Sequence, residues 1–310
     1  MRVPVIVGPT AVGKTAVAVE LAASLGGEII SADSRQVYRG MEIGTGAPEV
    51  DILKRVRHHL VGVVEPERRL SAGVFADRAR RALGEIIARG RVPLVVGGSG
   101  LYIRALVDGL APIPDLDPEA VRRVEREVDR RGMPAMLAEL AKVDPRYASK
   151  VGPRDRKRLV RALVVQRVTG RSFSEWHAVG NGNRLENPVI IGLTRPRGEL
   201  WGLIEKRVRA MMDRGWVGEL KALAEKYGGL NRLPAPVVEA LGYRQLIQYL
   251  RREISLETAV EQIVIATRRF AKRQMTWFRA DERVMWNRQS GPSAVMEWVE
   301  WTKSVISPMV

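Results

Sequence analysis

A glycine-rich loop close to the N-terminus constrains the fold of this chain more than any other feature of the sequence. Residues 8–15 read G-P-T-A-V-G-K-T, a complete G-x-x-x-x-G-K-T motif. The apolar run at 3–7 predicts a buried strand before the loop, and the apolar spacing at 14–25 predicts a helix after it. A loop in this context wraps its backbone N–H groups around phosphate oxygens. The sequence therefore predicts a phosphate-binding loop in an α/β fold.

The phosphate contacts are expected from six residues of this loop, namely Gly8, Thr10, Ala11, Gly13, Lys14 and Thr15. Lys14 supplies a positive charge, and the Thr15 hydroxyl can bind a Mg²⁺ ion. The motif does not distinguish a diphosphate from a triphosphate. A kinase or NTPase needs a metal-holding acid at the end of another core strand, whereas the run at 93–96 ends at Gly97 without one. Asp33 follows a strand-like run and could act as a base, as a metal-site acid or as both.

Further strand and helix patterns alternate along the chain. Apolar runs at 28–32, 92–96 and 189–193 predict buried strands, and the periodicity at 76–89 predicts an amphipathic helix that ends at Gly90. Strands that alternate with helices form parallel sheets. We therefore expect a P-loop NTPase-like α/β core built on a parallel sheet.

The pattern changes after a Pro-Ile-Pro break at 112–114. From 117 to about 176 the chain is charged and helically periodic, which predicts three or four helices and no strand, and a polar, glycine-bearing loop follows at 181–187. We expect an all-helical insertion domain at 115–186. The catalytic core would then comprise 1–114 and 187–310, with a mostly helical part at 197–280.

The composition limits the partners and the chemistry. A formal net charge of +16 attracts polyanions, so nucleic acid is the favoured partner, although an anionic membrane surface or a compositional bias also fits. The absence of cysteine excludes disulfides, cysteine-ligated zinc and a cysteine nucleophile. No apolar run is long enough to span a bilayer, and the apolar run at 3–7 has the pattern of a strand, so we expect no secretory signal. We expect a cytoplasmic protein.

Four further motifs carry a resemblance to a known family. They are S-A-D-S-R-Q-V-Y at 31–38, G-G-S-G-L-Y at 97–102, G-Y-R-Q at 242–245 and T-R-R-F-A-K-R-Q-M-T-W-F-R at 267–279. Together with the phosphate loop, and in this order, they resemble the bacterial tRNA dimethylallyltransferase family from about residue 3 to 286. The chain departs from the family at Ser99, where threonine is usual. The hydroxyl is kept, so we expect its role to be kept as well.

The resemblance implies a reaction and its participants. A dimethylallyl group would pass from dimethylallyl diphosphate to N6 of adenosine 37 in tRNAs that read codons beginning with U. The phosphate loop would hold the diphosphate of this donor with Mg²⁺, and the anticodon stem-loop would be the partner. A monomer with no membrane and no obligate protein partner is expected.

The resemblance also assigns catalytic roles to three residues. Asp33 would be the general base that removes a proton from the adenine amine, and its alternative role is a helix N-cap. Ser99 would donate a hydrogen bond to the bridging oxygen of the diphosphate, or would simply be a turn serine. Arg207, on a predicted helix at 200–212, would contact the diphosphate, or would be a solvated surface arginine.

Interleaved basic and aromatic residues suit RNA, because bases stack on rings and guanidinium groups meet phosphates. The residues that the resemblance implies at the tRNA are Asp33, Ser34, Arg35, Gln36, Ser99, Arg122, Lys157, Arg158, Arg161, Gly242, Tyr243, Arg244, Gln245, Lys272, Arg273, Gln274 and Arg279. The alternative for the last segment is a charged outer face with Trp277 and Phe278 in the core.

Two other activities remain as alternatives. An adenylate isopentenyltransferase acting on free adenine nucleotides would share the phosphate loop and Asp33, but it has less use for the net charge and the insertion. A P-loop kinase or NTPase would need the second acid that the sequence lacks. The histidines at 58, 59 and 177 have no metal-ligand spacing, so we expect His58 and His59 to be structural.

Overall fold

The computed structural model describes residues 2–179 and 182–306. Its centre is a sheet of six strands in the order β3-β2-β4-β1-β5-β6, and every neighbouring pair is parallel. This confirms the predicted parallel α/β core. The strands are β1 Val3–Val7, β2 Gly27–Ser31, β3 His58–His59, β4 Val92–Gly97, β5 Pro188–Thr194 and β6 Met285–Arg288.

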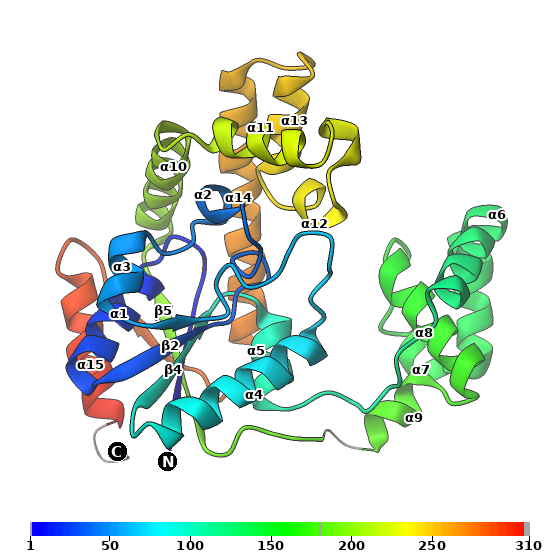
Figure 1. Ribbon diagram of the computed structural model, residues 1–310. Helices are drawn as coiled ribbons and strands as arrows, with labels where there is room; N and C mark the ends of the chain where they lie inside the picture. Colours follow the sequence, from blue (N-terminus) through cyan, green and yellow to red (C-terminus); the bar gives the residue numbers. More distant parts are fainter. Residues whose placement is uncertain (1, 180–181, 307–310) are drawn as a thin grey trace. The chain divides into compact units, whose positions relative to one another are not determined.

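The central strands are buried because helices cover both faces of the sheet. On one face α1 (Lys14–Leu25) packs with α15 (Ala294–Ile306), and on the other α4 (Ala72–Ala88) packs with α5 (Gly100–Val107) (Figure 1). Ile6 of β1 has no exposed surface. Strands covered on both sides read as continuous apolar runs, which is why four of them could be predicted from the sequence.

The helical part at 197–280 wraps the carboxyl ends of the strands. The long helix α14 contacts α5, α10 and α13 (Figure 1). The helices around this end are α2 Glu42–Thr45, α3 Val50–Arg55, α10 Arg197–Asp213, α11 Trp216–Lys226, α12 Ala235–Val238, α13 Tyr243–Leu250 and α14 Leu256–Arg279, with a 3₁₀ turn at Leu230–Arg232.

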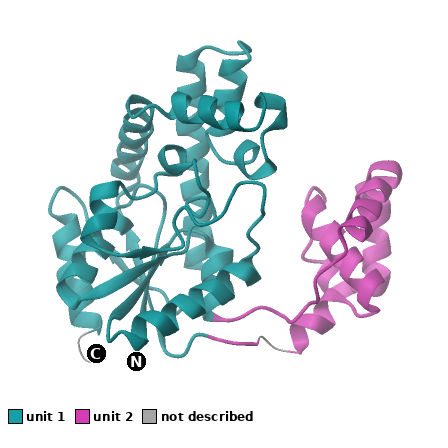
Figure 2. Ribbon diagram, viewed as in Figure 1, with its two compact units in different colours: residues 1–107, 185–310 teal, residues 108–184 magenta. Residues whose placement is uncertain are grey.

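Residues Asp108–Arg184 form a second compact unit with its own apolar core (Figure 2). Its helices are α6 Pro118–Val143, α7 Pro145–Ala148, α8 Arg156–Thr169 and α9 Phe173–Ala178. Gly132, with φ +79°, interrupts α6 beside Pro134. The sequence placed the insertion at 115–186. Position 181, in the polar loop predicted at 181–187, lies outside the described residues.

Some elements differ from the sequence-based expectation. Helix α4 begins at Ala72 instead of Ala76, because the Ser71 side chain accepts a hydrogen bond from the Val74 amide (3.2 Å) and caps the helix four residues earlier. The two edge strands and α15 were not predicted. β3 has two residues and β6 is only partly buried, so neither shows an apolar run.

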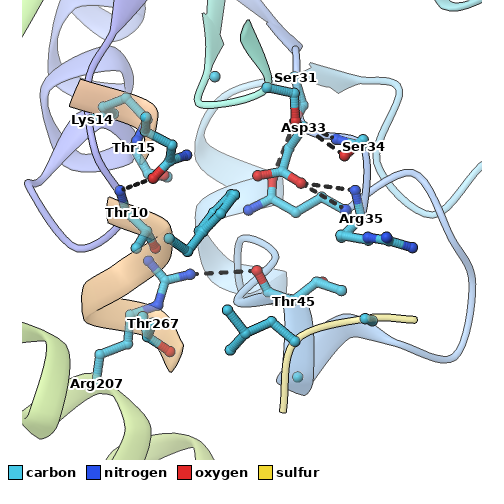
Figure 3. A pocket seen from close by; sticks show the side chains of 18 of the residues that line it. Thr10, Lys14, Thr15, Ser31, Asp33, Ser34, Arg35, Thr45, Arg207 and Thr267 are labelled. Carbon is cyan, nitrogen blue, oxygen red and sulfur yellow. Dashed lines mark hydrogen bonds between the residues drawn. The ribbon is translucent and has the colours of Figure 1, made fainter. Parts of the chain in front are cut away.

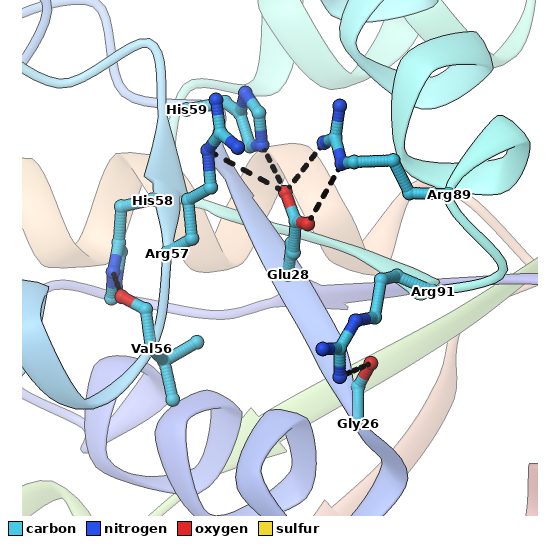
Figure 4. A network of polar contacts seen from close by, with 8 residues as sticks. All are labelled: Gly26, Glu28, Val56, Arg57, His58, His59, Arg89 and Arg91. Carbon is cyan, nitrogen blue, oxygen red and sulfur yellow. Dashed lines mark hydrogen bonds and ion pairs between the residues drawn. The ribbon is translucent and has the colours of Figure 1, made fainter.

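A buried carboxylate fastens the edge strand β3 to the sheet (Figure 4). Glu28 of β2 is 7% exposed, and it accepts hydrogen bonds from His59 Nε2 (2.6 Å) and from the Arg89 guanidinium (2.8 Å). A buried charge is tolerated when it is paired in this way. His59 is therefore a structural residue, as expected. Across the described ranges, no helix is long and apolar enough to cross a membrane.

Candidate active site

The phosphate loop occupies the turn between β1 and α1, and its backbone is held in a tight curl. Gly13 has φ +113° and Ala11 has φ +63°, both in the left-handed region. A Cβ at Gly8 would lie 2.5 Å from the Leu193 carbonyl oxygen, so the backbone of β5 lies in close contact with the loop and leaves room only for glycine. The Lys14 Nζ folds back and donates to the carbonyls of Gly8 (3.0 Å) and Pro9 (2.8 Å). The loop is thus preformed around its own lysine.

Arg207 reaches the same place from α10. Its guanidinium donates to the Thr45 carbonyl (3.4 Å), at the end of α2 (Figure 3). This bond is long, so it satisfies the group only weakly. A Cβ at Gly46 would overlap the guanidinium. The close approach of Arg207 therefore requires glycine at this position.

The electrostatics of the two cations set this site apart. Burial and, to a lesser degree, the nearby positive charge of Arg207 together lower the pKa of Lys14 to about 7, although the negative charge of Asp33 opposes the shift. Burial also lowers the pKa of Arg207. Neither cation forms an ion pair with a carboxylate among the described residues. Two such charges held together without a counter-ion are arranged to receive an anion.

Asp33 lies at the carboxyl end of β2 and lines the same cavity (Figure 3). Its Oδ1 accepts from the amides of Arg35 (2.8 Å) and Gln36 (3.3 Å). Asp33 therefore caps a turn; the N-cap alternative does not hold, because residues 34–37 form a turn instead of a helix. These bonds hold Oδ1 in place. The other oxygen, Oδ2, has no hydrogen bond to the described part of the chain. A carboxylate held in this way can accept a proton from a bound group.

Ser99 follows β4 and connects two of these loops. Its Oγ accepts from the Ser34 amide (2.9 Å) and donates to the Ser34 hydroxyl (3.2 Å). The carboxyl ends of parallel strands meet at one edge of a sheet, which brings the loop after β4 beside the loop after β2. The Ser99 hydroxyl can turn from Ser34 toward a ligand without moving the backbone.

A cavity of about 360 Å³ joins these groups, which supply its polar wall. The cavity also has apolar lining residues, namely Ala18, Ile29, Val208, Met211, Trp216, Leu241, Ile263 and Phe270. A second cavity of about 440 Å³ shares only Lys14, Thr15 and Arg207 with the first. The cations can therefore be approached from two sides.

Two residues expected at the tRNA have their side chains in the interior instead. Tyr243 has no exposed surface, and its hydroxyl donates to Glu219 (2.6 Å). Glu219 also accepts from the amides of Ile43 (2.6 Å) and Gly44 (2.9 Å), at the start of α2. Burial raises the pKa of Glu219. The Tyr243 ring cannot stack on a base here, because it supports the helix whose end receives Arg207.

Gln274 is the second of these residues. It is 6% exposed, and its amide bonds to Thr10 and to Gly98. The polar, basic sequence around it suggested an outward position, but Gln274 lies on the buried stripe of α14. The amide of Thr10, expected at the phosphates, is thereby already engaged.

Most of the other residues expected at the tRNA have solvent-exposed side chains, and some of these form ion pairs with nearby carboxylates. In the second unit, Arg122 pairs with Glu119 (2.8 Å) and Arg158 with Asp155 (3.3 Å). The exposed members of the set are Arg122, Lys157, Arg158, Arg161, Arg244, Lys272, Arg273 and Arg279, and the partly buried ones are Ser34, Arg35, Gln36 and Gln245. Gly242 packs against Trp216.

The last motif divides between surface and core. Phe278 is buried, whereas Trp277 is 40% exposed and lies over Gly100. The alternative that placed both aromatic residues in the core is right for Phe278 alone. Arg195, which the sequence did not suggest, donates to the Val12 carbonyl (3.0 Å) and supports the phosphate loop from the end of β5.

A divalent metal ion fits this site without a cage of protein ligands. The described residues contain no group of three or more His, Cys, Asp or Glu side chains arranged to hold a metal. Mg²⁺ commonly keeps waters and binds one or two protein oxygens together with substrate phosphates. The Thr15 hydroxyl and the Asp33 carboxylate, both lining the cavity, are donors of that kind.

The fold and the site define a P-loop protein of the parallel α/β class, in which Lys14 of the loop and Arg207 line one cavity with the Asp33 carboxylate. A family model described as IPP transferase matches residues 36–281. The chain belongs to this family.

Individual relatives agree with this assignment. The tRNA dimethylallyltransferase of Anaeromyxobacter dehalogenans is 44% identical over 287 residues, covering 92% of this chain and 94% of the relative. The tRNA isopentenylpyrophosphate transferase of Bacillus halodurans has a similar structure, with TM-score 0.69, 35% identity and coverage of 99% and 97%. A eukaryotic dimethylallyltransferase acting on tRNA has TM-score 0.84 at 25% identity, covering 99% of this chain and 78% of that one.

Proposed function

We propose that this chain is a tRNA dimethylallyltransferase. It transfers a dimethylallyl group from dimethylallyl diphosphate to N6 of adenosine 37, in tRNAs that read codons beginning with U. The observation that carries the proposal is the pair Lys14 and Arg207, two cations that share one cavity with an apolar wall and a carboxylate. The names of the relatives support the acceptor and the donor.

The diphosphate and the prenyl chain of the donor match different parts of the cavity. Its diphosphate is an anion for the phosphate loop, where Gly8, Ala11, Gly13, Lys14 and Thr15 hold it and Thr10 keeps its bond to Gln274. Arg207 adds a second positive charge from α10. The five-carbon chain lies against the apolar wall, which also keeps water from the reacting carbon.

The chemistry requires one bond to form and one to break. The adenine N6 attacks C1 of the prenyl group, and the C1–O bond breaks so that diphosphate departs with the electron pair. Asp33 Oδ2 takes the proton that N6 loses. Ser99 turns its hydroxyl from Ser34 to the bridging oxygen, while Lys14 and Arg207 stabilise the charge that develops there.

A Mg²⁺ ion would be held by the Thr15 hydroxyl, with the Asp33 carboxylate as a second oxygen donor from the same cavity. When bound, it neutralises part of the negative charge on the diphosphate. The oxygen donors in the cavity suit this ion.

The acceptor must leave its stack to reach Asp33. Extruding a base costs a few kcal/mol, and contacts with the rest of the RNA compensate for it. We assign these contacts to the exposed basic residues of both units, Arg122, Lys157, Arg158, Arg161, Arg244, Lys272, Arg273 and Arg279, together with the loop at 33–36.

The experiment offers the purified protein dimethylallyl diphosphate and Mg²⁺, with either an unmodified anticodon stem-loop or AMP as the acceptor. Mass spectrometry should find one five-carbon unit on the stem-loop and none on AMP. Transfer to AMP would indicate an adenylate isopentenyltransferase. ATP turnover without prenyl transfer would indicate a kinase or NTPase.

A further inference from the structure

One buried amide connects two loops that come from distant parts of the chain. Gln274 Oε1 accepts from the Thr10 amide (2.8 Å), and Gln274 Nε2 donates to the Gly98 carbonyl (2.9 Å). Thr10 belongs to the phosphate loop, and Gly98 directly precedes Ser99. The side chain therefore links the loop that surrounds Lys14 to the loop that carries the second hydroxyl of the site.

The two hydrogen bonds require the side-chain amide of glutamine. The Thr10 amide needs an acceptor and the Gly98 carbonyl needs a donor, and an uncharged amide offers both on one planar group. An ionised carboxylate lacks the donor, and an ammonium lacks the acceptor. A Cβ at Gly98 would overlap the Gln274 amide, so the backbone also makes room for this side chain.

The surroundings keep these bonds out of solvent. Gln274 is 6% exposed, and hydrogen bonds in such an environment are costly to leave unmade. Its neighbours Lys272 and Arg273 lie on the exposed face of α14. The same helix thus presents basic side chains outward and the amide inward.

We propose that Gln274 is a positioning residue, which fixes the separation between the phosphate loop and Ser99 so that both can engage one diphosphate. The inference rests on the proposed function, since the diphosphate is that of the prenyl donor. Gln274 also lines the cavity, but both ends of its amide are already bonded to the two loops. Replacing it changes donor binding and turnover, and leaves the intrinsic affinity for tRNA unchanged.

The test compares Gln274→Met and Gln274→Glu with Gln262→Glu, a matched control at an exposed position of the same helix. We expect Gln274→Met to lower kcat on the stem-loop roughly 10- to 100-fold, because small misplacements of reacting groups are costly. It should also raise the KM for dimethylallyl diphosphate. The dissociation constant for the stem-loop should stay within about twofold, and the control should behave as the wild type.

The pH profile of Gln274→Glu distinguishes positioning from a general loss of structure. A protonated carboxyl can accept from Thr10 and donate to Gly98, whereas the ionised form cannot donate. The ratio of its kcat to that of the wild type should therefore rise as the pH falls, and the ratio for Gln274→Met should stay flat.

Three outcomes would overturn the inference: wild-type kcat and donor KM in Gln274→Met, equal and pH-independent losses in both variants, or weakened stem-loop binding with normal turnover at saturating RNA. Failure of the proposed function has a different signature, because the wild type itself would then transfer nothing. Binding of inorganic diphosphate with Mg²⁺ would still compare the variants in that case, and equal affinities would overturn the inference.

Discussion

Arg207 stands close enough to Lys14 to lower the pKa of the lysine, although the two residues come from different helices. A protein gains no stability from placing two partly buried cations close together. Interactions that oppose stability in this way are concentrated at functional sites. An incoming diphosphate replaces the repulsion with attraction to both groups.

Donor binding should therefore depend on pH. Because the pKa of Lys14 is about 7 in the free protein, its charged form is lost as the pH rises above 7. The diphosphate favours the charged form, so affinity for dimethylallyl diphosphate should fall as the pH rises from neutral into the alkaline range. Calorimetry in buffers of different ionisation enthalpy should show proton uptake on binding at mildly alkaline pH. A Lys14→Arg variant stays charged at this pH, so it should take up no proton on binding. If the variant still took up a proton, Lys14 would not be the group that is protonated.

Asp33→Asn separates the chemistry from donor binding. The asparagine oxygen can still accept from the amides of Arg35 and Gln36, so the turn is kept. Without the carboxylate, kcat should fall by about 10²- to 10⁴-fold. Affinity for the donor, measured without Mg²⁺, should stay the same or rise, because a negative charge leaves the anion site. Stopped-flow and binding measurements check this, with Asp51→Asn on the surface as the control. A variant that bound the donor poorly and kept its kcat would contradict the base assignment.

The sequence predicted the elements whose residues are local and repetitive, and it missed those that depend on distant partners. Four strands could be predicted because they are apolar throughout, whereas β3 and β6 are short and partly exposed. The positions of Asp33 and Ser99 just after strands could be predicted, because the strands before them are apolar runs. The partners of Tyr243 and Gln274 could not, since Tyr243 meets Glu219 at a separation of 24 residues and Gln274 meets Thr10 at 264. The basic and polar residues around Tyr243 and Gln274 suggested exposed positions, whereas tertiary contacts bury both side chains.

Tyr243→Phe tests this interior role. The phenylalanine keeps the ring and removes the donor to the buried Glu219, so stability should fall by about 1–3 kcal/mol. The start of α2 should loosen, and donor affinity should weaken because α2 ends at the carbonyl that receives Arg207. Affinity for the stem-loop should not change. Urea unfolding and fluorescence anisotropy measure these effects. Arg244→Ala, at the exposed neighbouring position, should weaken affinity for the stem-loop and leave stability and donor affinity unchanged. If Tyr243→Phe weakened stem-loop affinity and Arg244→Ala did not, the interior role of Tyr243 would be refuted.

The exposed residues of α14 should contribute through charge. Each cation that meets a phosphate releases counter-ions, which makes binding depend on salt. Replacing Lys272 or Arg279 with glutamine should reduce the slope of log affinity against log salt by about 0.7–0.9 for each phosphate that is no longer neutralised. Titrations of the stem-loop from low to moderate salt give the slope. Arg209→Gln on α10, where the arginine pairs with Glu205, is the control. Unchanged slopes in both α14 variants would remove this helix from the RNA interface.

The position of the added group tests the account most directly. Stem-loops with guanosine in place of adenosine 36, 37 or 38 would each be incubated with the protein, dimethylallyl diphosphate and Mg²⁺, then digested and analysed by tandem mass spectrometry. We expect one dimethylallyl group on N6 of adenosine 37, and no product from the stem-loop in which that nucleotide is replaced. A group on another nucleotide, on a different atom of adenosine 37, or on the RNA that lacks adenosine 37, would contradict it.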